Sequence, residues 1–199
     1  MNIVCIDMES VLTPEIWVEF AEKTHIPELR RTTREEPDYE KLMAWRLDIL
    51  RRHGLGLADI QQVIAQIDPL DGAREFLDAL RGEVQVIVLS DTFEEFAAPL
   101  LEKLGRPTIF CNDLEVAPDG EILRCRMRIE NSKLTTVKAL QSIGFETIAI
   151  GDSFNDVGMI RASKAGFLFH AAPATRAANP DLPACDTFAE LLAAVRAVL

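Results

Sequence analysis

The sequence predicts an α/β fold, a doubly wound parallel sheet with a small helical cap inserted after the first strand and a β-hairpin. Three observations support this fold class. Short apolar runs are continuous rather than alternating, as in parallel strands that are buried on both faces. Helical stretches separate these runs, and such alternation is typical of an open α/β sheet. Polar residues directly follow several runs, at the edge where such sheets bind ligands.

The core strands are expected at the apolar runs Ile3–Ile6, Val84–Leu89, Thr147–Ile150 and Gly166–Phe169. Helices are expected between and after them, at Glu94–Leu104, Leu134–Ser142, Asp156–Ala162 and Thr187–Val198. Because strands and helices alternate along the chain, the strands are expected to pair in parallel, with the helices covering both faces of the sheet.

A long interval without strand-like runs follows the first strand. Its helical stretches are Glu15–Thr24, Tyr39–His53 and Leu57–Ile67. Gly54 and Gly56 separate the last two and suit a helix stop and restart. We therefore expect an α/β core at residues 1–12 and 70–199, and a helical cap at residues 13–69 that covers the strand ends.

Alternating residues predict the hairpin. Leu114 and Val116 alternate with a glutamate, and the segment Pro118-Asp119-Gly120 supplies turn chemistry. Beyond the turn, every second residue is apolar and is expected on a buried face, namely Leu123, Cys125, Met127 and Ile129. The arginines between them are expected to face water. Arg128 is five residues before Lys133, so the Arg128 side chain could instead reach a ligand pocket at the strand ends.

Composition narrows the partners. The chain has 32 acidic and 21 basic side chains and a net charge of −11, which argues against nucleic acid and against an anionic membrane surface. A small anionic substrate stays compatible, because a metal ion or a few cations can dominate a pocket. No signal peptide, membrane span or Cys-x-x-Cys pair is visible, so a cytoplasmic location is expected. The oligomeric state is open, and a homodimer is one state that we consider.

Polar side chains follow three of the predicted strands. One such residue alone is weak evidence, because Asp and Ser often cap helices or begin turns. Several at neighbouring strand ends predict a shared site, because the carboxyl ends of parallel strands meet at one edge. The set consists of Asp7 and Glu9, Ser90 and Asp91, and Asp152 and Asp156, with Lys133 between the second and third groups.

These residue types together fit phosphoryl transfer through an aspartyl-phosphate. A carboxylate nucleophile divides hydrolysis into two easier displacements. Attack by an anion on a phosphate dianion needs counter-charge, which carboxylates can recruit as Mg²⁺. A lysine can neutralise a further phosphoryl oxygen, and N–H groups at a helix start can hold the others. The leaving alcohol needs a proton, which the second acid of the first pair can supply.

Four motifs occur along the chain, in the order Asp7-x-Glu9-x-Val11, Ser90, Lys133 and Gly151-Asp152-x-x-Asn155-Asp156. In type and order they resemble the motifs of the haloacid dehalogenase superfamily, whose core is a Rossmann-like sheet. The narrower resemblance is to phosphoserine phosphatases, and above all to bacterial relatives described as phosphoserine:homoserine phosphotransferases. It is carried by the segments Pro14-Glu15-Ile16-Trp17, Leu89-Ser90-Asp91-Thr92-Phe93 and Ile150-Gly151-Asp152-Ser153-Phe154-Asn155-Asp156.

The resemblance implies a role for each matched position. Asp7 would be the nucleophile and a ligand of Mg²⁺. Glu9 would be the general acid and base, and its backbone carbonyl would bind the metal. Lys133 would pair with the phosphoryl oxygens and with the nucleophile. Asp152 would be the side-chain metal ligand, while Asp156 would support either the metal shell or the lysine.

Four further positions would bind the substrate, which the resemblance implies is O-phospho-L-serine. Ser90 would hydrogen-bond the phosphoryl oxygens, and Asn155 would face the substrate. Glu15 resembles the cap acid that meets the substrate ammonium. Arg46 resembles the arginine that binds the carboxylate, for which a planar guanidinium is suited. The alternatives are ordinary ones, namely a helix cap for Ser90 and solvated helix faces for Glu15, Arg46 and Lys133.

The sequence departs from the typical pattern in two ways. Glu9 stands where the superfamily's phosphatases usually carry Asp, a change of about one methylene that also occurs in the phosphotransferase-like relatives. Asp91 and Thr92 follow Ser90, where typical phosphoserine phosphatases have glycines. The second departure leaves open which backbone amides face the phosphoryl group.

The expected function is that of a Mg²⁺-dependent phosphoserine phosphatase. Water is the default acceptor, and homoserine is the alternative acceptor that the resemblance adds. A second hypothesis is a phosphatase for another small phosphomonoester. A third is a phosphorylatable switch like a receiver domain, and the weakest is a non-catalytic binding module. The paired Asp7 and Glu9 and the helical insertion count against a switch, because they supply an acid and a substrate lid.

Overall fold

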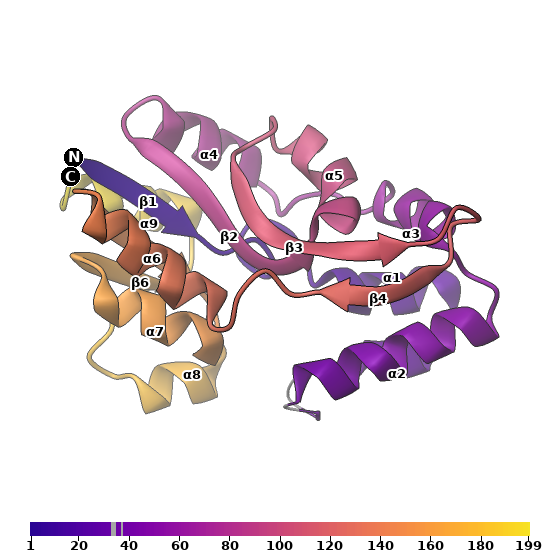
Figure 1. The fold of residues 1–199 in the computed structure, drawn as a ribbon. Helices are drawn as coiled ribbons and strands as arrows, with labels where there is room; N and C mark the ends of the chain where they lie inside the picture. Colours follow the sequence, from indigo (N-terminus) through magenta and orange to yellow (C-terminus); the bar gives the residue numbers. More distant parts are fainter. Residues whose placement is uncertain (33–34, 37) are drawn as a thin grey trace.

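The computed structural model describes residues 1–32, 35–36 and 38–199. Within this part of the chain, a seven-stranded sheet has the order β4-β3-β2-β1-β5-β6-β7 (Figure 1). The strands are β1 (Asn2–Ile6), β2 (Gln85–Phe93), β3 (Ile109–Val116), β4 (Ile122–Arg126), β5 (Glu146–Gly151), β6 (Ala165–Phe169) and β7 (Ala184–Cys185). Neighbouring strands pair in parallel, except that β3 and β4 are antiparallel.

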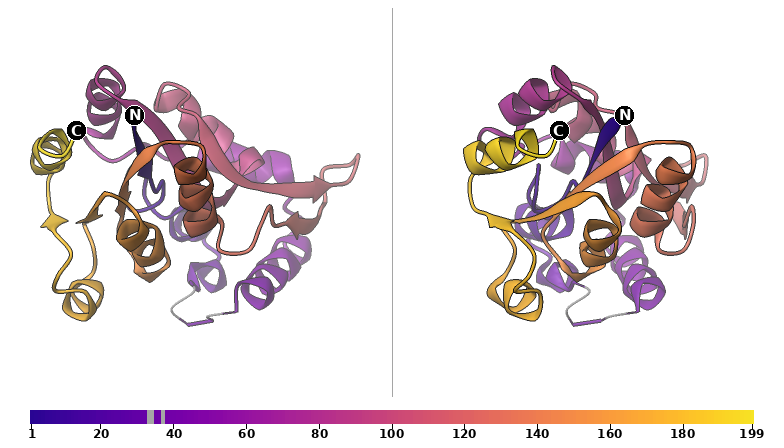
Figure 2. Two further views of the ribbon diagram at one scale, coloured as in Figure 1. Left: turned by 60° about the vertical axis from the view of Figure 1, so that its left-hand side comes forward. Right: turned by 90° about the vertical axis from the view of Figure 1, so that its left-hand side faces the viewer.

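Helices cover both faces of the sheet. They are α1 (Ile16–Thr24), α2 (Tyr39–Arg52), α3 (Leu57–Ile64), α4 (Ala73–Arg81), α5 (Glu94–Lys103), α6 (Ser132–Ser142), α7 (Phe154–Ala162), α8 (Pro173–Ala178) and α9 (Phe188–Arg196), with a 3₁₀ helix at Pro27–Arg30. Figure 2 shows α4 and α9 on one side of the sheet and α6 and α7 on the other. This arrangement is the doubly wound layering that the alternation of strands and helices predicts.

The central strand β1 explains why the apolar runs are continuous. Val4 and Ile6 belong to the core cluster that includes α4 and α9, whereas Ile3 and Cys5 belong to the cluster that includes α6 and α7. Successive side chains of a strand point to opposite faces, so both faces must be apolar here. Burial of one such side chain contributes about 1.5–3 kcal/mol relative to exposure.

The hairpin of β3 and β4 packs against the helical insertion. Figure 1 shows it extending from the sheet over α1 toward α3, with α2 beside β4. The N–H of Leu57 donates to the carbonyl oxygen of Gly120 at 2.9 Å. A Cβ on Gly56 would lie 2.9 Å from the same oxygen, so this close approach requires glycine. Arg51 on α2 also pairs with Glu121 in the turn, at 2.8 Å.

One expectation about the hairpin is wrong. The predicted buried face beyond the turn does not form, because β4 ends at Arg126 and is an edge strand. Leu123, Met127 and Ile129 are 45%, 42% and 43% exposed, and Cys125 is half-buried. Alternation alone cannot tell which face of an edge strand another element covers. Here α2 covers only part of it.

Four further elements were not expected, namely α4, α8, the short strand β7 and the 3₁₀ helix. In addition, β2 continues through Ser90 to Phe93 because Phe93 still pairs with β3. The two termini lie side by side, and the amide of Asn2 donates to the carbonyl of Leu199 at 2.7 Å (Figures 1 and 2). The cysteines are free thiols. Among the helices of the described residues, none combines the length and the apolar character that crossing a membrane requires.

Candidate active site

The carboxyl ends of three strands converge on one site. Asp7 directly follows β1, which lies between β2 and β5, and its N–H donates to the carbonyl of Ile150 at 2.9 Å. Asp152 directly follows β5, while Ser90 lies near the end of β2. The strand order reverses at β1, so the site occupies the switch point where open α/β sheets bind ligands.

A buried lysine joins two of the acids. Nζ of Lys133 lies 2.9 Å from Oδ1 of Asp7 and 2.7 Å from Oδ1 of Asp156. Lys133 is only 4% exposed, so the alternative of a solvated lysine at a helix entry is wrong. Oδ1 of Asp7 also accepts the N–H of Met8 at 2.8 Å, which fixes the carboxylate plane.

The Asp156 carboxylate is held from both sides. Its second oxygen accepts the N–H groups of Asp152 and Ser153, each at 3.1 Å. Gly151 makes room for it, because a Cβ there would lie 2.3 Å from both Cβ and Cγ of Asp156. The first position of the Gly-Asp-x-x-Asn-Asp motif therefore requires glycine in this chain for steric reasons.

Burial and like charge raise the carboxyl pKa values in the metal-free fold. Burial and the neighbouring Asp156 raise the pKa of Asp7 well above its usual value, although Lys133 opposes them. The same two causes raise the pKa of Asp152 to about 7. Burial opposes the charged form of Lys133, but Asp156 and Asp7 outweigh it and raise its pKa well above the ordinary value. The site therefore favours a bound cation.

The acids can form a cation site. One carboxylate oxygen each from Asp7, Asp152 and Asp156 lie within 4.8 Å of one another. With the carboxylates ionised, the three acids and Lys133 leave a formal charge of −2, which a divalent cation would cancel. An all-oxygen donor set fits a hard ion such as Mg²⁺. Glu9, the remaining predicted ligand, does not join this cluster through its side chain.

The Glu9 carboxylate instead contacts the first helix of the insertion. Its Oε2 accepts the N–H of Ile16, the first residue of α1, at 3.0 Å. Burial and the neighbouring Glu15 raise the pKa of Glu9 to about 7, although the Ile16 N–H lowers it. A carboxyl with a pKa near neutrality can both donate and accept a proton at physiological pH.

Ser90 is nearly fully buried in the same site. Its Oγ accepts the N–H of Thr92 at 3.2 Å, so the hydroxyl proton can be donated to a ligand. The helix-cap alternative for Ser90 is wrong, because α5 begins at Glu94 and Phe93 is its N-cap residue.

Arg46, on α2, is buried within the insertion. It is 4% exposed, its guanidinium lies 4.5 Å from the centre of the Trp17 ring, and it donates to the carbonyl of Arg31 at 2.7 Å. Its Nε is the buried side-chain nitrogen that lacks a hydrogen-bond partner within the described part of the chain. A solvated helix face is thus wrong for Arg46. Glu15 is half-buried and is the N-cap residue of α1.

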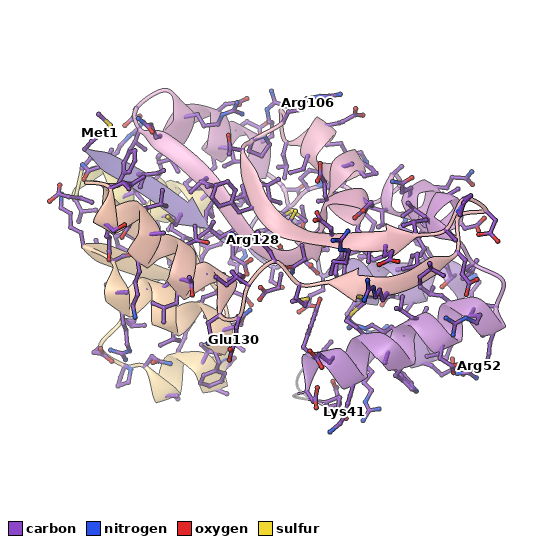
Figure 3. The ribbon with its side chains drawn as sticks, viewed as in Figure 1. Met1, Lys41, Arg52, Arg106, Arg128 and Glu130 are labelled. Carbon is purple, nitrogen blue, oxygen red and sulfur yellow. The ribbon has the colours of Figure 1, made fainter. Side chains whose placement is uncertain are left out.

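The last predicted residues lie at the other side of the site. Nδ2 of Asn155 donates to Oδ2 of Asp91 at 3.1 Å. Arg128 does not join the acid cluster: its guanidinium donates to Thr136 Oγ1 at 3.0 Å and lies 5.3 Å from the Phe110 ring centre. Figure 3 labels Arg128 on the segment between β4 and α6. The sequence did not single out Tyr39, whose hydroxyl donates to the Asp91 carbonyl at 3.1 Å. An aromatic residue at a helix start gives no signal of such a contact.

Known proteins resemble this chain in sequence and in fold. Residues 1–164 match the family model described as haloacid dehalogenase-like hydrolase. Phosphoserine phosphatase ThrH of Pseudomonas aeruginosa is 48% identical over 191 residues, which cover 96% of this chain and 93% of that protein. A crystal structure of phosphoserine phosphatase in apo form has a TM-score of 0.74 at 24% identity, with 92% of each chain covered.

A structure titled as a phospho-aspartyl intermediate analogue of phosphoserine phosphatase has a TM-score of 0.69 at 24% identity, again over 92% of each chain. At this identity the structural likeness establishes the fold, and it confirms the predicted fold class. The family model and the 48% identical relative establish more. The chain belongs to the haloacid dehalogenase-like hydrolase family, in its phosphoserine phosphatase-like branch.

Proposed function

We propose that this chain is a Mg²⁺-dependent phosphoserine phosphatase that acts through an aspartyl-phosphate on Asp7. The observation that carries the proposal is the buried Lys133, held at 2.9 Å from Asp7 and 2.7 Å from Asp156. A lysine in this place neutralises a carboxylate and can neutralise an incoming phosphoryl oxygen as well. The 48% identity to a protein named phosphoserine phosphatase supports the substrate.

In the first step, the Asp7 carboxylate attacks phosphorus. The bond between phosphorus and the serine oxygen breaks as the bond to the aspartate forms. Oδ1 of Asp7 accepts bonds from Lys133 and Met8, so we assign the attack to Oδ2. Glu9 donates a proton to the leaving serine oxygen, and Ser90 donates a hydrogen bond to a phosphoryl oxygen.

In the second step, water replaces the aspartate. Glu9, now ionised, accepts a proton from the water as its oxygen bonds to phosphorus and the bond to Asp7 breaks. Inorganic phosphate leaves, and Glu9 is again protonated. Asp7, Asp152 and the backbone carbonyl of Glu9 would hold Mg²⁺, which when bound supplies positive charge for the phosphoryl oxygens.

The replacement of Asp7 tests the covalent mechanism. We expect Asp7→Asn to abolish phosphate release from O-phospho-L-serine in the presence of Mg²⁺, because an amide cannot form the acyl-phosphate. Asp113→Asn is the matched control, since Asp113 is an exposed aspartate on β3. Full turnover by Asp7→Asn would exclude the mechanism.

Arg46 and Glu15 are proposed to recognise the amino-acid part of the substrate. The unpartnered Nε of Arg46 supports a buried carboxylate partner, because an unsatisfied buried donor is costly. We expect Arg46→Ala to lower kcat/KM for phosphoserine by about 100-fold. The loss in kcat/KM for p-nitrophenyl phosphate, which lacks a carboxylate, should be much smaller. An equal loss for both substrates would favour another small phosphomonoester.

Transfer to homoserine is the second candidate reaction. The Tyr39 hydroxyl contacts the Asp91 carbonyl and so joins α2 to the core beside the site. We propose that this contact limits the access of water, which would favour an alcohol as the acceptor. An alcohol bound there would compete for the same aspartyl-phosphate. Incubation with phosphoserine and Mg²⁺, with and without homoserine, separates the reactions when free phosphate and phosphohomoserine are measured separately.

Three further proposals concern the whole chain. We propose that residues 13–69 act as a cap, to which the hairpin is joined by the Leu57–Gly120 hydrogen bond. A homodimer would cover exposed apolar side chains of the hairpin region such as Leu123 and Met127. Light scattering of the intact protein tests it, and a monomer at micromolar concentration would exclude it. The free thiols support a cytoplasmic location.

A further inference from the structure

Asp91 receives hydrogen bonds from four directions. Its carboxylate oxygens accept the hydroxyl of Ser132 at 2.9 Å and Nδ2 of Asn155 at 3.1 Å. Its backbone carbonyl accepts the hydroxyl of Tyr39 at 3.1 Å and Nδ2 of Asn112 at 3.0 Å. One residue at the end of β2 therefore joins α2, β3, α6 and α7.

Two of these partners stand directly beside site residues. Ser132 is the first residue of α6 and precedes Lys133, while Asn155 precedes Asp156 in the first turn of α7. Ser132 is buried, so its hydroxyl needs a partner inside the protein. A carboxylate is a strong acceptor for both groups, because hydrogen bonds to charged atoms exceed those between neutral atoms.

The Asn155 amide is held at both ends. Nδ2 donates to Asp91, and Oδ1 accepts the hydroxyl of Ser153 at 2.5 Å. These two bonds fix which way the amide points, and they leave one N–H of Nδ2 to offer to a ligand. Without Asp91, the exposed Asn155 side chain would keep only the bond from Ser153, and its amide would be held in this orientation less firmly.

We infer that Asp91 is a positioning residue. It orients the Asn155 amide that faces the substrate, and it holds the start of α6 against the end of β2. The inference rests on the proposed phosphoserine phosphatase activity and adds a residue to which the resemblance gave no role. A glycine at position 91 could accept through its backbone carbonyl alone. The carboxylate bonds to Ser132 and Asn155 are thus a property of the aspartate in this chain.

Three variants test the inference in steady-state assays with O-phospho-L-serine and Mg²⁺. Asp91→Ala removes both carboxylate bonds, and we expect KM to rise about tenfold while kcat falls less. Asp91→Asn keeps one acceptor oxygen for Asn155, and the Ser132 hydroxyl can turn to accept from the new amide. We expect its KM to stay within about twofold of the parent protein. Asp113→Ala removes the same charge from an exposed aspartate on β3 and should leave both KM and kcat unchanged.

A double-mutant cycle shows whether Asp91 acts through Asn155. We expect Asn155→Ala to raise KM, and Asp91→Ala in that background to raise it by less than twofold more. A full tenfold rise in KM on top of Asn155→Ala would overturn the inference, as would an Asp91→Asn variant as impaired as Asp91→Ala. The latter result would mean that charge, rather than hydrogen bonding, is what Asp91 supplies.

A readout without substrate separates this inference from the proposed function. Hydrogen exchange of the backbone amides at the starts of α6 and α7 should be faster in Asp91→Ala than in the parent protein and in Asp113→Ala. Unchanged exchange at both helix starts would overturn the inference. If the parent protein releases no phosphate from phosphoserine but the exchange rises as expected, the proposed substrate fails and the tie between the strand and helix ends stands.

Discussion

The positive charge of Lys133 allows three buried carboxylates to share one site. Without it, Asp7, Asp152 and Asp156 would repel one another where charges are poorly solvated, and they would take up protons instead. With it, Asp156 is held in an ion pair at 2.7 Å and Asp7 in another at 2.9 Å. The remaining negative charge creates the demand for a cation.

The role of Glu9 can be separated from its placement by an isosteric change. In Glu9→Gln the amide oxygen can still accept the Ile16 N–H, but the residue cannot donate an acidic proton to the leaving group. We expect kcat for phosphoserine to fall by about 10²–10⁴-fold, the usual worth of general acid–base catalysis.

A substrate with a good leaving group sharpens this prediction. Nitrophenolate needs no proton to leave, so p-nitrophenyl phosphate should still phosphorylate Asp7 in Glu9→Gln, while attack by water lacks its base. Stopped-flow absorbance should then show a burst of nitrophenolate close to one per protein chain, followed by slow turnover. The absence of a burst together with an unchanged phosphoserine rate would refute the assignment of Glu9.

Single residues could be predicted where chemistry leaves a pattern in the chain. The four motifs place acids, a serine and a lysine at strand ends and helix starts. The structure brings three of these residues together, namely Asp7, Lys133 and Asp152. Tyr39 could not be found in this way. Its contact with the Asp91 carbonyl joins residues 52 positions apart, and it depends on how α2 lies against the sheet.

At the scale of elements, buried strands were easier to predict than the hairpin. The run Ile3–Ile6 in β1 is apolar at every position because helices cover both faces, and its shortness favours a buried strand over a helix. The strand β4 has neighbours on one edge only, so its alternation did not reveal which side chains are covered. Helix α4 lies between the insertion and β2, and its buried residues have the spacing of one helix face, so the sequence did carry a signal for it; they are Ala73, Phe76, Leu77 and Leu80.

The turn between β5 and α7 is an element whose geometry can be tested. A Cβ at position 151 would lie 2.3 Å from Cβ and Cγ of Asp156, so the carboxylate must move away from Lys133 or the turn must shift. We expect Gly151→Ala to lower the free energy of unfolding by about 2 kcal/mol, as overpacking does, and to remove most activity. Denaturant unfolding and phosphate release measure the two effects.

Gly158→Ala is the matched control for that change. Gly158 lies on α7, the helix that carries Asp156, and its added Cβ would only meet Leu134 at an ordinary 3.5 Å. Alanine is the better helix former, so this variant should gain up to about 1 kcal/mol and keep its activity. A Gly151→Ala protein as stable and active as Gly158→Ala would contradict the steric account.

At the scale of the whole molecule, the site lies where the insertion meets the core. Arg46 and Glu15 come from the insertion, whereas Asp7 and Lys133 come from the core. The Tyr39 hydroxyl and the bond from Glu9 to the Ile16 N–H both cross between the two parts. The residues proposed to bind the amino-acid part of the substrate and those proposed to carry out the chemistry thus come from different segments, and motion of the insertion would change both sets together.

Stability of the whole chain should depend on Mg²⁺ in a pH-dependent way. In the metal-free fold the pKa of Asp152 is raised to about 7, and that of Asp7 is raised also, whereas an unfolded aspartate titrates near 3.9. Between these values the folded state binds more protons than the unfolded state. The free energy of unfolding without metal therefore falls as pH rises from about 4, and the part of this loss that comes from Asp152 is complete above about pH 7.

A divalent cation binds the ionised acids and removes this penalty, so its benefit should grow with pH. At about pH 8, Mg²⁺ at 100 times its dissociation constant should stabilise the fold by about 2.7 kcal/mol, which raises Tm by about 5 °C or more. At about pH 5.5 the shift should be clearly smaller, because protons compete for the same oxygens. Thermal unfolding of chelator-treated protein, with and without Mg²⁺, measures both shifts. In Asp152→Asn the shift at the higher pH should largely disappear, and an equal shift at both pH values would mean that Mg²⁺ binds elsewhere.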